Sequence, residues 1–229
     1  MDNLWSKPFG IEKGIMKAYK TSPRKRRIIA HGDAAAEAMI GPLEHGCEIF
    51  GLTGGQFSFI DILEHCLSQI GQAHCVIATW TASYANIEKA MRFTNDSRLL
   101  SCRWLVDRSF KTRKPDLCKH LVDTFGPHAI RTASSHAKFL LLWNDEWNIA
   151  IRTSMNLNQN PRVENFEISD DRNLCDYMRG LCESVFCGEG DGLAFSTKNE
   201  TEKVTTKMTT GELWQGKLSL NMAPISLTV

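Results

Sequence analysis

Apolar residues in the first half of the chain follow two spacings in turn, one typical of strands and one typical of helices. Three short apolar runs have the length and composition of buried strands: 47–52, 75–80 and 99–106. Three segments carry apolar residues at helical spacing: 57–70, 82–93 and 116–125. Three strand–helix units in a row favour crossover connections, and therefore a largely parallel sheet covered on both faces.

The second half of the chain changes this pattern. Apolar runs at 139–142 and 147–151 flank the polar residues 144–146, which predicts a β-hairpin. A strand at about 163–168 and a helix at about 171–186 complete the regular part. The fold class that we predict is α/β, with a mixed, mostly parallel sheet flanked by helices on both faces.

Composition changes on either side of this regular part and indicates three regions. Residues 1–45 form a basic N-terminal lead-in, residues 46–187 form the predicted domain, and residues 188–229 form a weakly structured tail. The lead-in contains a dense basic run: Arg24, Lys25, Arg26 and Arg27. Such a run is either a solvated arm or an arm that contacts phosphates.

Bulk composition excludes several classes of protein. The chain has 229 residues, of which 42% are hydrophobic and 23% charged, so it is not disordered throughout. The net charge is only +1, so affinity for nucleic acid has to come from a local basic patch. No stretch approaches the roughly 20 apolar residues of a membrane span, and the first residues lack the order of a secretory signal. We therefore expect a cytoplasmic protein that does not bind membranes.

The eight cysteines do not form a zinc motif, because no two of them lie two to four positions apart. Without an export signal, reduced thiols are a better interpretation than disulfide bonds.

Three pairs of polar residues at positions i and i+2 lie in or beside strand-like segments of the second half. The pairs are His136 with Lys138, Ser154 with Asn156, and Asn165 with Glu167. In a strand, the side chains of such a pair share one face, so each pair can line one polar pocket. The residues between them are apolar, and we expect them to pack into the core: Ala137, Met155 and Phe166.

These residue types suit phosphoryl transfer. The imidazole of His136 can attack phosphorus or protonate a leaving oxygen, and the ammonium of Lys138 can neutralise phosphate oxygens. A carboxylate at Glu167 can accept from the far ring nitrogen of His136 and so select its tautomer. No cluster of carboxylates suggests a divalent metal, and we expect neither a metal nor another cofactor.

In their order and spacing, the three pairs resemble the HxK, GSxN and NxE elements of the phospholipase D superfamily, over roughly residues 45–187. By this resemblance His136 is the nucleophile, which forms a phosphohistidine that water hydrolyses, and Glu167 orients it. The residues that the resemblance places around the substrate are Lys138, Ser154, Asn156 and Asn165. Only one copy of the motif is present, and single-copy members resemble bacterial nucleases and metal-independent restriction endonucleases, in which two chains complete one active site. The resemblance therefore implies a homodimer.

Two positions depart from the family pattern. The aspartate expected five residues after the lysine is Trp143, and the glycine expected before Ser154 is Thr153. Neither change removes a residue that the resemblance places on the phosphate.

The function that we predict is a metal-independent endonuclease that cleaves DNA. Phosphate contacts would come from the basic run of the lead-in and from a second basic cluster: Arg103, Arg108, Lys111, Arg113 and Lys114. That cluster follows the third strand, at the carboxyl end where open α/β sheets bind ligands. Two alternatives remain open: a phosphodiesterase on lipid headgroups, and an inactive module that binds nucleic acid, which Trp143 favours.

Overall fold

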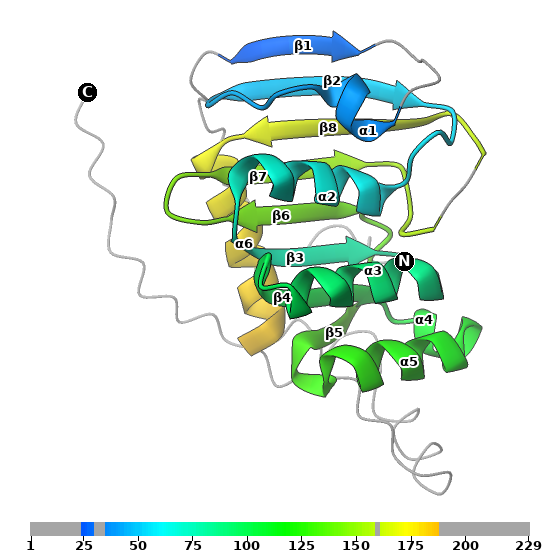
Figure 1. Ribbon diagram of the computed structural model, residues 1–229. Helices are drawn as coiled ribbons and strands as arrows, with labels where there is room; N and C mark the ends of the chain where they lie inside the picture. The colour runs from blue at the N-terminus through cyan, green and yellow to red at the C-terminus, as the bar shows by residue number, and fades with distance from the viewer. Residues whose placement is uncertain (1–23, 30–34, 159–160, 188–229) are drawn as a thin grey trace, which may run out of the picture.

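Eight strands form one sheet at the centre of the computed structural model, which describes residues 24–29, 35–158 and 161–187 (Figure 1). The strands are β1 (Lys25–Ile29), β2 (Cys47–Thr53), β3 (Ala73–Thr79), β4 (Leu99–Asp107), β5 (Ile130–Ala133), β6 (Phe139–Trp143), β7 (Asn148–Thr153) and β8 (Glu164–Asp170). The helices are α1 (Ala36–Ile40), α2 (Phe59–Ile70), α3 (Tyr84–Asn95), α4 (Phe110–Arg113), α5 (Pro115–Phe125), the short 3-10 helix η1 (Pro127–Ala129) and α6 (Arg172–Cys187). These bounds agree with every strand and helix expected between residues 46 and 187 and add three short elements, β5, α4 and η1.

The order of the strands across the sheet is β1-β2-β8-β7-β6-β3-β4-β5. The pairs β1–β2, β3–β4 and β4–β5 are parallel. The pairs β2–β8, β3–β6, β6–β7 and β7–β8 are antiparallel. The α/β class and the mixed sheet are confirmed, whereas the prediction of a mostly parallel sheet was wrong. The reason is that the β6–β7 hairpin and β8 insert between β2 and β3, and each of these strands runs against its neighbours.

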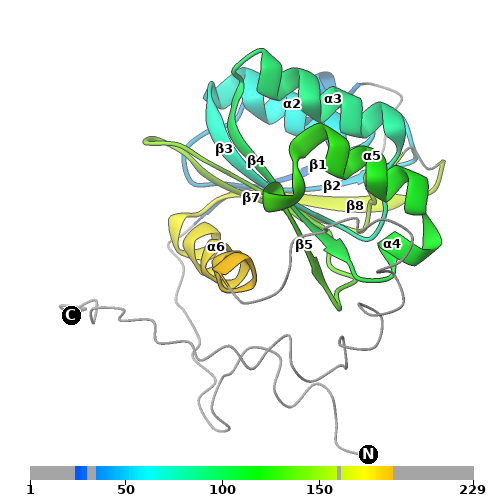
Figure 2. The same cartoon turned by 90° about the horizontal axis from the view of Figure 1, so that it is seen from below.

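Helices cover both faces of the sheet, but unequally (Figure 2). Helices α2, α3 and α5 lie on one face and α6 crosses the other. The larger apolar cluster lies under α2, α3 and α5 and contains the bulkiest buried side chains: Phe59, Phe93, Trp104, Phe110 and Phe166. A smaller cluster joins α6 to β3, β4, β6 and β7 through residues such as Leu141 and Cys175. The strands β1, β2 and β8 extend beyond α6 on this second face.

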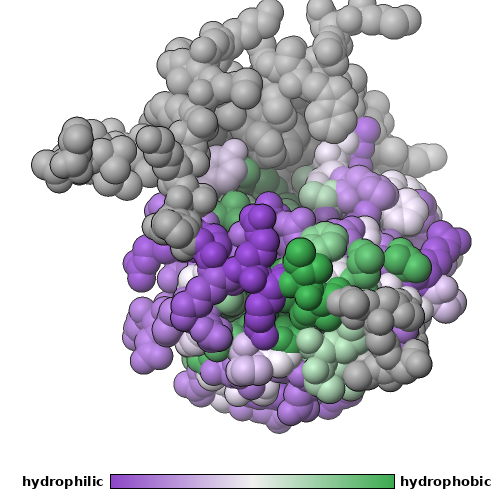
Figure 3. Space-filling model, turned by 90° about the horizontal axis from the view of Figure 1, so that it is seen from above, coloured by the Kyte–Doolittle hydropathy of each residue, from purple (hydrophilic) through white to green (hydrophobic). Residues whose placement is uncertain are grey.

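Part of the predicted lead-in belongs to the sheet, so the predicted boundary at residue 45 was wrong. β1 is an edge strand that pairs with β2 from Lys25 opposite Cys47 to Ile29 opposite Gly51. The residues of β1 are mostly charged and show no alternation of apolar and polar positions, because an edge strand needs little burial. The hydrophobicity pattern therefore did not predict this strand. Ile28 of β1 is 77% exposed, and Figure 3 shows apolar side chains between hydrophilic ones on this side of the molecule. The predicted tail, residues 188–229, lies outside the described residues.

The eight cysteines are free thiols, and all except Cys187 are buried. Burial raises the pKa of Cys118 to about 11 and the pKa of Cys175 and of Cys182 to about 12. These thiols therefore pack as small hydrophobic side chains. Among the described residues, no helix is long and apolar enough to cross a bilayer.

Gly51 in β2 leaves room for the ring of Phe166, its partner in β8. An added Cβ at residue 51 would meet three atoms of that ring, the farthest at 2.9 Å, whereas a Cβ at Gly180 in α6 would meet no atom within 4 Å. We expect Gly51→Ala to lower the free energy of unfolding by about 1–3 kcal/mol, because the buried ring has to move. The control Gly180→Ala should raise it by roughly 0.5–1 kcal/mol, because alanine favours helix. Urea unfolding measures both changes, and equal stabilities would contradict this account of Gly51.

Candidate functional site

The residues of the three predicted polar pairs, except Glu167 in the middle of β8, lie along one edge of the sheet. This edge holds the carboxyl ends of β2, β3, β4, β5 and β7 and the starts of β6 and β8. His136 and Lys138 lie between β5 and β6, Ser154 and Asn156 follow β7, and Asn165 is the second residue of β8. The carboxyl ends of parallel strands are the usual ligand-binding edge of α/β sheets.

His136 and Lys138 contact each other directly. The Lys138 Nζ atom lies 2.9 Å from Nδ1 of His136 and 3.5 Å from Nε2, and it donates to the His136 carbonyl oxygen at 3.0 Å. His136 is exposed and Lys138 is half-buried. The two side chains therefore form an accessible imidazole–ammonium pair.

The backbone around this pair is not a strand, which corrects one expectation. Ala137 is exposed rather than buried, because residues 134–138 precede β6 and do not alternate between faces. The backbone N–H of Ala137 donates to Ser135 Oγ at 3.1 Å, which is the contact of a turn. Met155 and Phe166, the middle residues of the other two pairs, are buried as predicted, at 4% and 0% exposure.

Glu167 does not contact His136, so its predicted role in orienting the imidazole was wrong. Its carboxylate forms an ion pair with Arg152 at 2.5 Å. Arg152 is its direct partner across β7 and β8, and β7 separates β8 from β6. The cross-strand arginine therefore takes the carboxylate that the pattern assigned to histidine.

Lys138 lies against the imidazole instead. Its Nζ atom is 2.9 Å from Nδ1 and 3.5 Å from Nε2, so the ammonium lies over the ring and not in line with the lone pair of one nitrogen. Burial lowers the pKa of Lys138 below its ordinary value, and the charge of Glu164 partly opposes that shift. Lys138 is thus closer to losing its proton than an exposed lysine.

Glu164 is a residue of this edge that the sequence analysis missed. It begins β8, and the hydroxyl of Ser154 donates to its carboxylate. The same Ser154 oxygen accepts from the backbone N–H of Asn165 at 3.0 Å. Ser154 is exposed but already engaged in two hydrogen bonds. The pattern could have suggested Glu164 only as the neighbour of Asn165, since its contact with Ser154 arises from the pairing of β7 with β8.

Asn156 lies beside the end of β3. The next residue, Leu157, donates its N–H to the Thr81 carbonyl oxygen at 3.1 Å and to Thr79 Oγ1 at 3.2 Å. These bonds fasten the segment after β7 to the segment that contains Trp80. The side-chain oxygen of Asn156 is buried and has no hydrogen-bond partner within the described part of the chain.

Trp80 and Arg113 also border the histidine, although the sequence pattern gave Trp80 no functional role. The Trp80 and His136 rings have centroids 5.4 Å apart, at an interplanar angle of 53°. The guanidinium carbon of Arg113 lies 3.6 Å from the Trp80 ring centroid. Arg113 also donates to the Trp80 carbonyl oxygen and to Ser109 Oγ, each at 2.8 Å. An aromatic residue directly after an apolar strand was the available signal for Trp80.

The basic run of β1 lies away from this pair. Four strand spacings separate β1 from β6, roughly 19 Å, and each basic side chain has a protein partner. Three of them pair with carboxylates and one donates to a carbonyl oxygen: Arg24 with Asp171, Lys25 with Glu44, Arg26 with Glu48, and Arg27 with Pro42. The run is therefore not a free arm, and its contact with phosphates stays a prediction.

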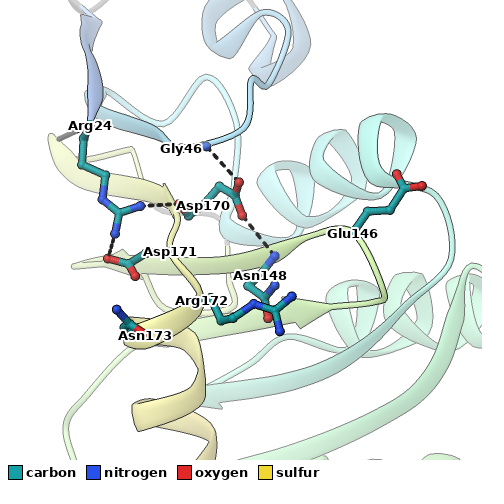
Figure 4. Close-up of a pocket in the computed structure, with 8 residues that line it drawn as sticks. All are labelled: Arg24, Gly46, Glu146, Asn148, Asp170, Asp171, Arg172 and Asn173. Carbon is teal, nitrogen blue, oxygen red and sulfur yellow. Dashed lines mark hydrogen bonds and ion pairs between the residues drawn. The ribbon is translucent and has the colours of Figure 1, made fainter. Parts of the chain in front are cut away.

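Arg24 lines a polar pocket of about 280 Å³ at the opposite edge of the sheet (Figure 4). The Asp170 carboxylate in this pocket accepts from the N–H of Gly46 at 2.9 Å and from that of Asn148 at 3.1 Å. The Arg24 guanidinium donates to the Asp170 carbonyl oxygen at 2.7 Å and pairs with Asp171. These contacts fix the start of α6 against β1 and β2, which is a structural role.

The second basic cluster divides into structural and accessible residues. Arg103 pairs with Glu183 of α6, whereas Arg108 and Lys114 are exposed at the edge that holds His136. Arg108 and Lys114 therefore stay candidates for contact with a substrate.

Trp143 lies at the far end of β6 from Lys138, about 17 Å away along the strand. Its ring stacks on His74, with centroids 5.5 Å apart, and the Arg179 guanidinium lies over it at 4.4 Å. Trp143 is thus a packing residue under α6. It does not touch the His136–Lys138 pair.

No described group of three or more His, Cys, Asp and Glu side chains is placed to hold a metal ion. No model of a known protein family matches the chain, and no curated protein matches it.

The charge of Glu164 should be measurable in the pKa of Lys138. Glu164→Gln removes a negative charge that favours the ammonium, so the pKa of Lys138 should fall further below its ordinary value. A pH titration of ¹³C-methylated lysines by NMR, with Lys138→Arg to assign the signal, reports this shift. Glu167→Gln is the matched control and should leave the signal unchanged, because Glu167 pairs with Arg152. A shift in the control alone would contradict the assigned contacts.

Proposed function

We propose that this chain hydrolyses phosphodiester bonds of nucleic acid without a metal ion, and that His136 is the nucleophile. The observation that carries the proposal is the accessible His136 imidazole with the Lys138 ammonium 2.9 Å from its Nδ1 atom. This pair supplies a nucleophile and a positive charge at the same point, which is what attack on an anionic phosphodiester requires.

Lys138 changes its partner in this mechanism. Before substrate binds, its ammonium lies against the His136 ring and donates to the His136 carbonyl oxygen. A charged non-bridging phosphate oxygen is a stronger acceptor than these neutral groups, so the ammonium turns to the phosphate. An unprotonated ring nitrogen of His136 attacks phosphorus, and the P–O bond to the leaving oxygen breaks. Water then attacks the phosphohistidine and releases the second product.

The leaving oxygen needs a proton, and a single His136 cannot be nucleophile and acid in the same step. The second acid is the protonated His136, an imidazolium, of another copy of the chain across a two-fold axis, and it becomes neutral as it gives its proton to the leaving oxygen. The exposure of His136 suits such an arrangement, since its ring is accessible to a partner. The proposed form is therefore a homodimer with one composite site.

Nucleic acid is the substrate class that the surroundings of His136 favour over a lipid headgroup. Arg108 and Lys114 are exposed at the same edge and supply charge for further phosphates along a polymer. A lipid headgroup offers only one phosphodiester.

An inactive binding module is the second candidate, and two contacts favour it. Glu167 is held by Arg152, and Ser154 donates to Glu164, so neither contributes to a phosphate pocket in this arrangement. Binding without turnover is the expected behaviour if these contacts persist in the complex.

A nuclease assay on single-stranded and duplex DNA in excess EDTA tests the proposed chemistry. Cleavage should survive chelation, and acid-sensitive, base-stable phosphate should be trapped on His136. His136→Ala should reduce cleavage by several orders of magnitude, because it removes the nucleophile. Glu167→Gln should leave cleavage within about threefold of the parent, since its partner is Arg152. Cleavage that requires added magnesium would refute the mechanism, and binding without any cleavage would support the inactive module.

Mixing the parent with His136→Ala tests the composite site. If each site needs two histidines, an equal mixture of exchanged dimers keeps roughly a quarter of the parent's activity. Independent sites in a monomer keep roughly half. Light scattering on the same samples gives the oligomeric state.

A further inference from the structure

Arg113 has no carboxylate partner in the described structure. In this it differs from six other arginines, which pair with carboxylates: Arg24, Arg26, Arg98, Arg103, Arg152 and Arg179. Arg113 is half-buried, and its guanidinium contacts a hydroxyl, a carbonyl oxygen and the ring of Trp80. A partly desolvated charge without a counter-ion costs free energy of folding. A guanidinium held in place by three neutral contacts is therefore a suitable binding group for an anion.

Trp80 connects this charge to the proposed nucleophile. Its ring is in contact with the Arg113 guanidinium and lies 5.4 Å from the His136 ring, centroid to centroid. Trp80 is half-buried, so part of the indole is accessible at the same edge. An indole and a guanidinium plane are the two side-chain groups on which unpaired bases stack most readily.

We infer that Trp80 and Arg113 bind the nucleotide next to the scissile phosphate, so that the substrate is an unpaired, single-stranded region of nucleic acid. The base stacks on the Trp80–Arg113 pair, and Arg113 also neutralises the flanking phosphate. A base inside a duplex is stacked on both faces and paired at its edge, so it cannot reach an aromatic side chain without being flipped out. This inference rests on the proposed function for the position of the scissile phosphate.

The arrangement of the network favours binding over a purely structural role for Arg113. Its partner Ser109 is tied to Asp107, which accepts from the Ser109 N–H at 2.9 Å and from the Ser135 N–H at 3.3 Å. Ser135 directly precedes His136. The residues that hold Arg113 thus also hold the segment that carries the nucleophile, which keeps the two at a constant separation.

Binding to the full chain with His136→Ala, which cannot form the phosphohistidine, separates recognition from cleavage. Three fluorescein-labelled probes are compared by anisotropy: a dT dodecamer, a dodecamer of abasic tetrahydrofuran nucleotides, and the dT dodecamer paired with dA. The dT strand should bind about tenfold more tightly than the abasic strand, in line with the effect of one aromatic–base stack. It should also bind more tightly than the duplex.

Substitutions identify the side chains responsible. Trp80→Leu keeps an apolar side chain but no ring, and should remove most of the preference for dT over the abasic strand. Trp80→Phe should restore part of it. Arg113→Gln should weaken the binding of all three probes and reduce the dependence of binding on salt. The matched control is Trp143→Leu, which removes the other tryptophan that stacks with an arginine and lies at the opposite end of β6. It should leave the preference unchanged.

The outcomes distinguish this inference from the proposed function. Cleavage of DNA by the parent, with equal binding of dT and abasic strands or no effect of Trp80→Leu on their ratio, would overturn the inference and leave the chemistry intact. A Trp80-dependent preference for dT without any cleavage by the parent would support the binding site and overturn the hydrolytic function. If Trp80→Leu lowers the melting temperature far more than Trp143→Leu does, Arg113→Gln decides the question, and unchanged binding of all three probes by that variant overturns the inference.

Discussion

The antiparallel pairing of β3 with β6 positions the whole candidate site. Ala78 lies opposite Phe139, so the residues just before β6 are brought beside the residues just after β3. Lys138 and His136 precede β6, and Trp80 follows β3, which is why side chains almost 60 positions apart share one edge of the sheet. The Leu157 N–H then bonds to the same end of β3 and adds the segment after β7. Any loss of the β3–β6 register would separate the imidazole from the tryptophan and the tryptophan from Asn156.

Several cations of the described surface pair with carboxylates, among them Lys25 and Arg26 of β1, and such exposed pairs contribute little energy. Lys138 and Arg113 have no such ion pair within the described residues. Lys138 contacts an imidazole and a carbonyl oxygen, and Arg113 contacts neutral groups and a ring. Positive charge that no acidic partner holds at close range therefore lies on both sides of His136.

The His136–Lys138 contact holds the nucleophile and the cation together before substrate arrives, which reduces the ordering that the reaction requires. The ammonium lies within 3.5 Å of both ring nitrogens and donates to the carbonyl oxygen of the same residue. An anion that takes this ammonium therefore comes directly beside the imidazole.

Local pattern was enough to predict the α/β class, the order of strands and helices over residues 46–187 and the burial of Met155 and Phe166, because period-2 and period-3.6 spacing reflect which face of an element is covered. It was also enough to select His136 and Lys138, whose contact spans only two positions.

The sequence pattern did not predict contacts in which the partner comes from another strand. Glu167 pairs with Arg152 rather than with histidine, Ser154 meets Glu164, and Arg113 stacks on Trp80, and each of these depends on strand order and register. Strand β1 escaped prediction for the same reason, since its charged side chains find their partners only after β2 and β8 are in place. The sequence by itself thus determined the elements and the candidate pair, and only the tertiary structure decided which charges are neutralised and which remain beside His136.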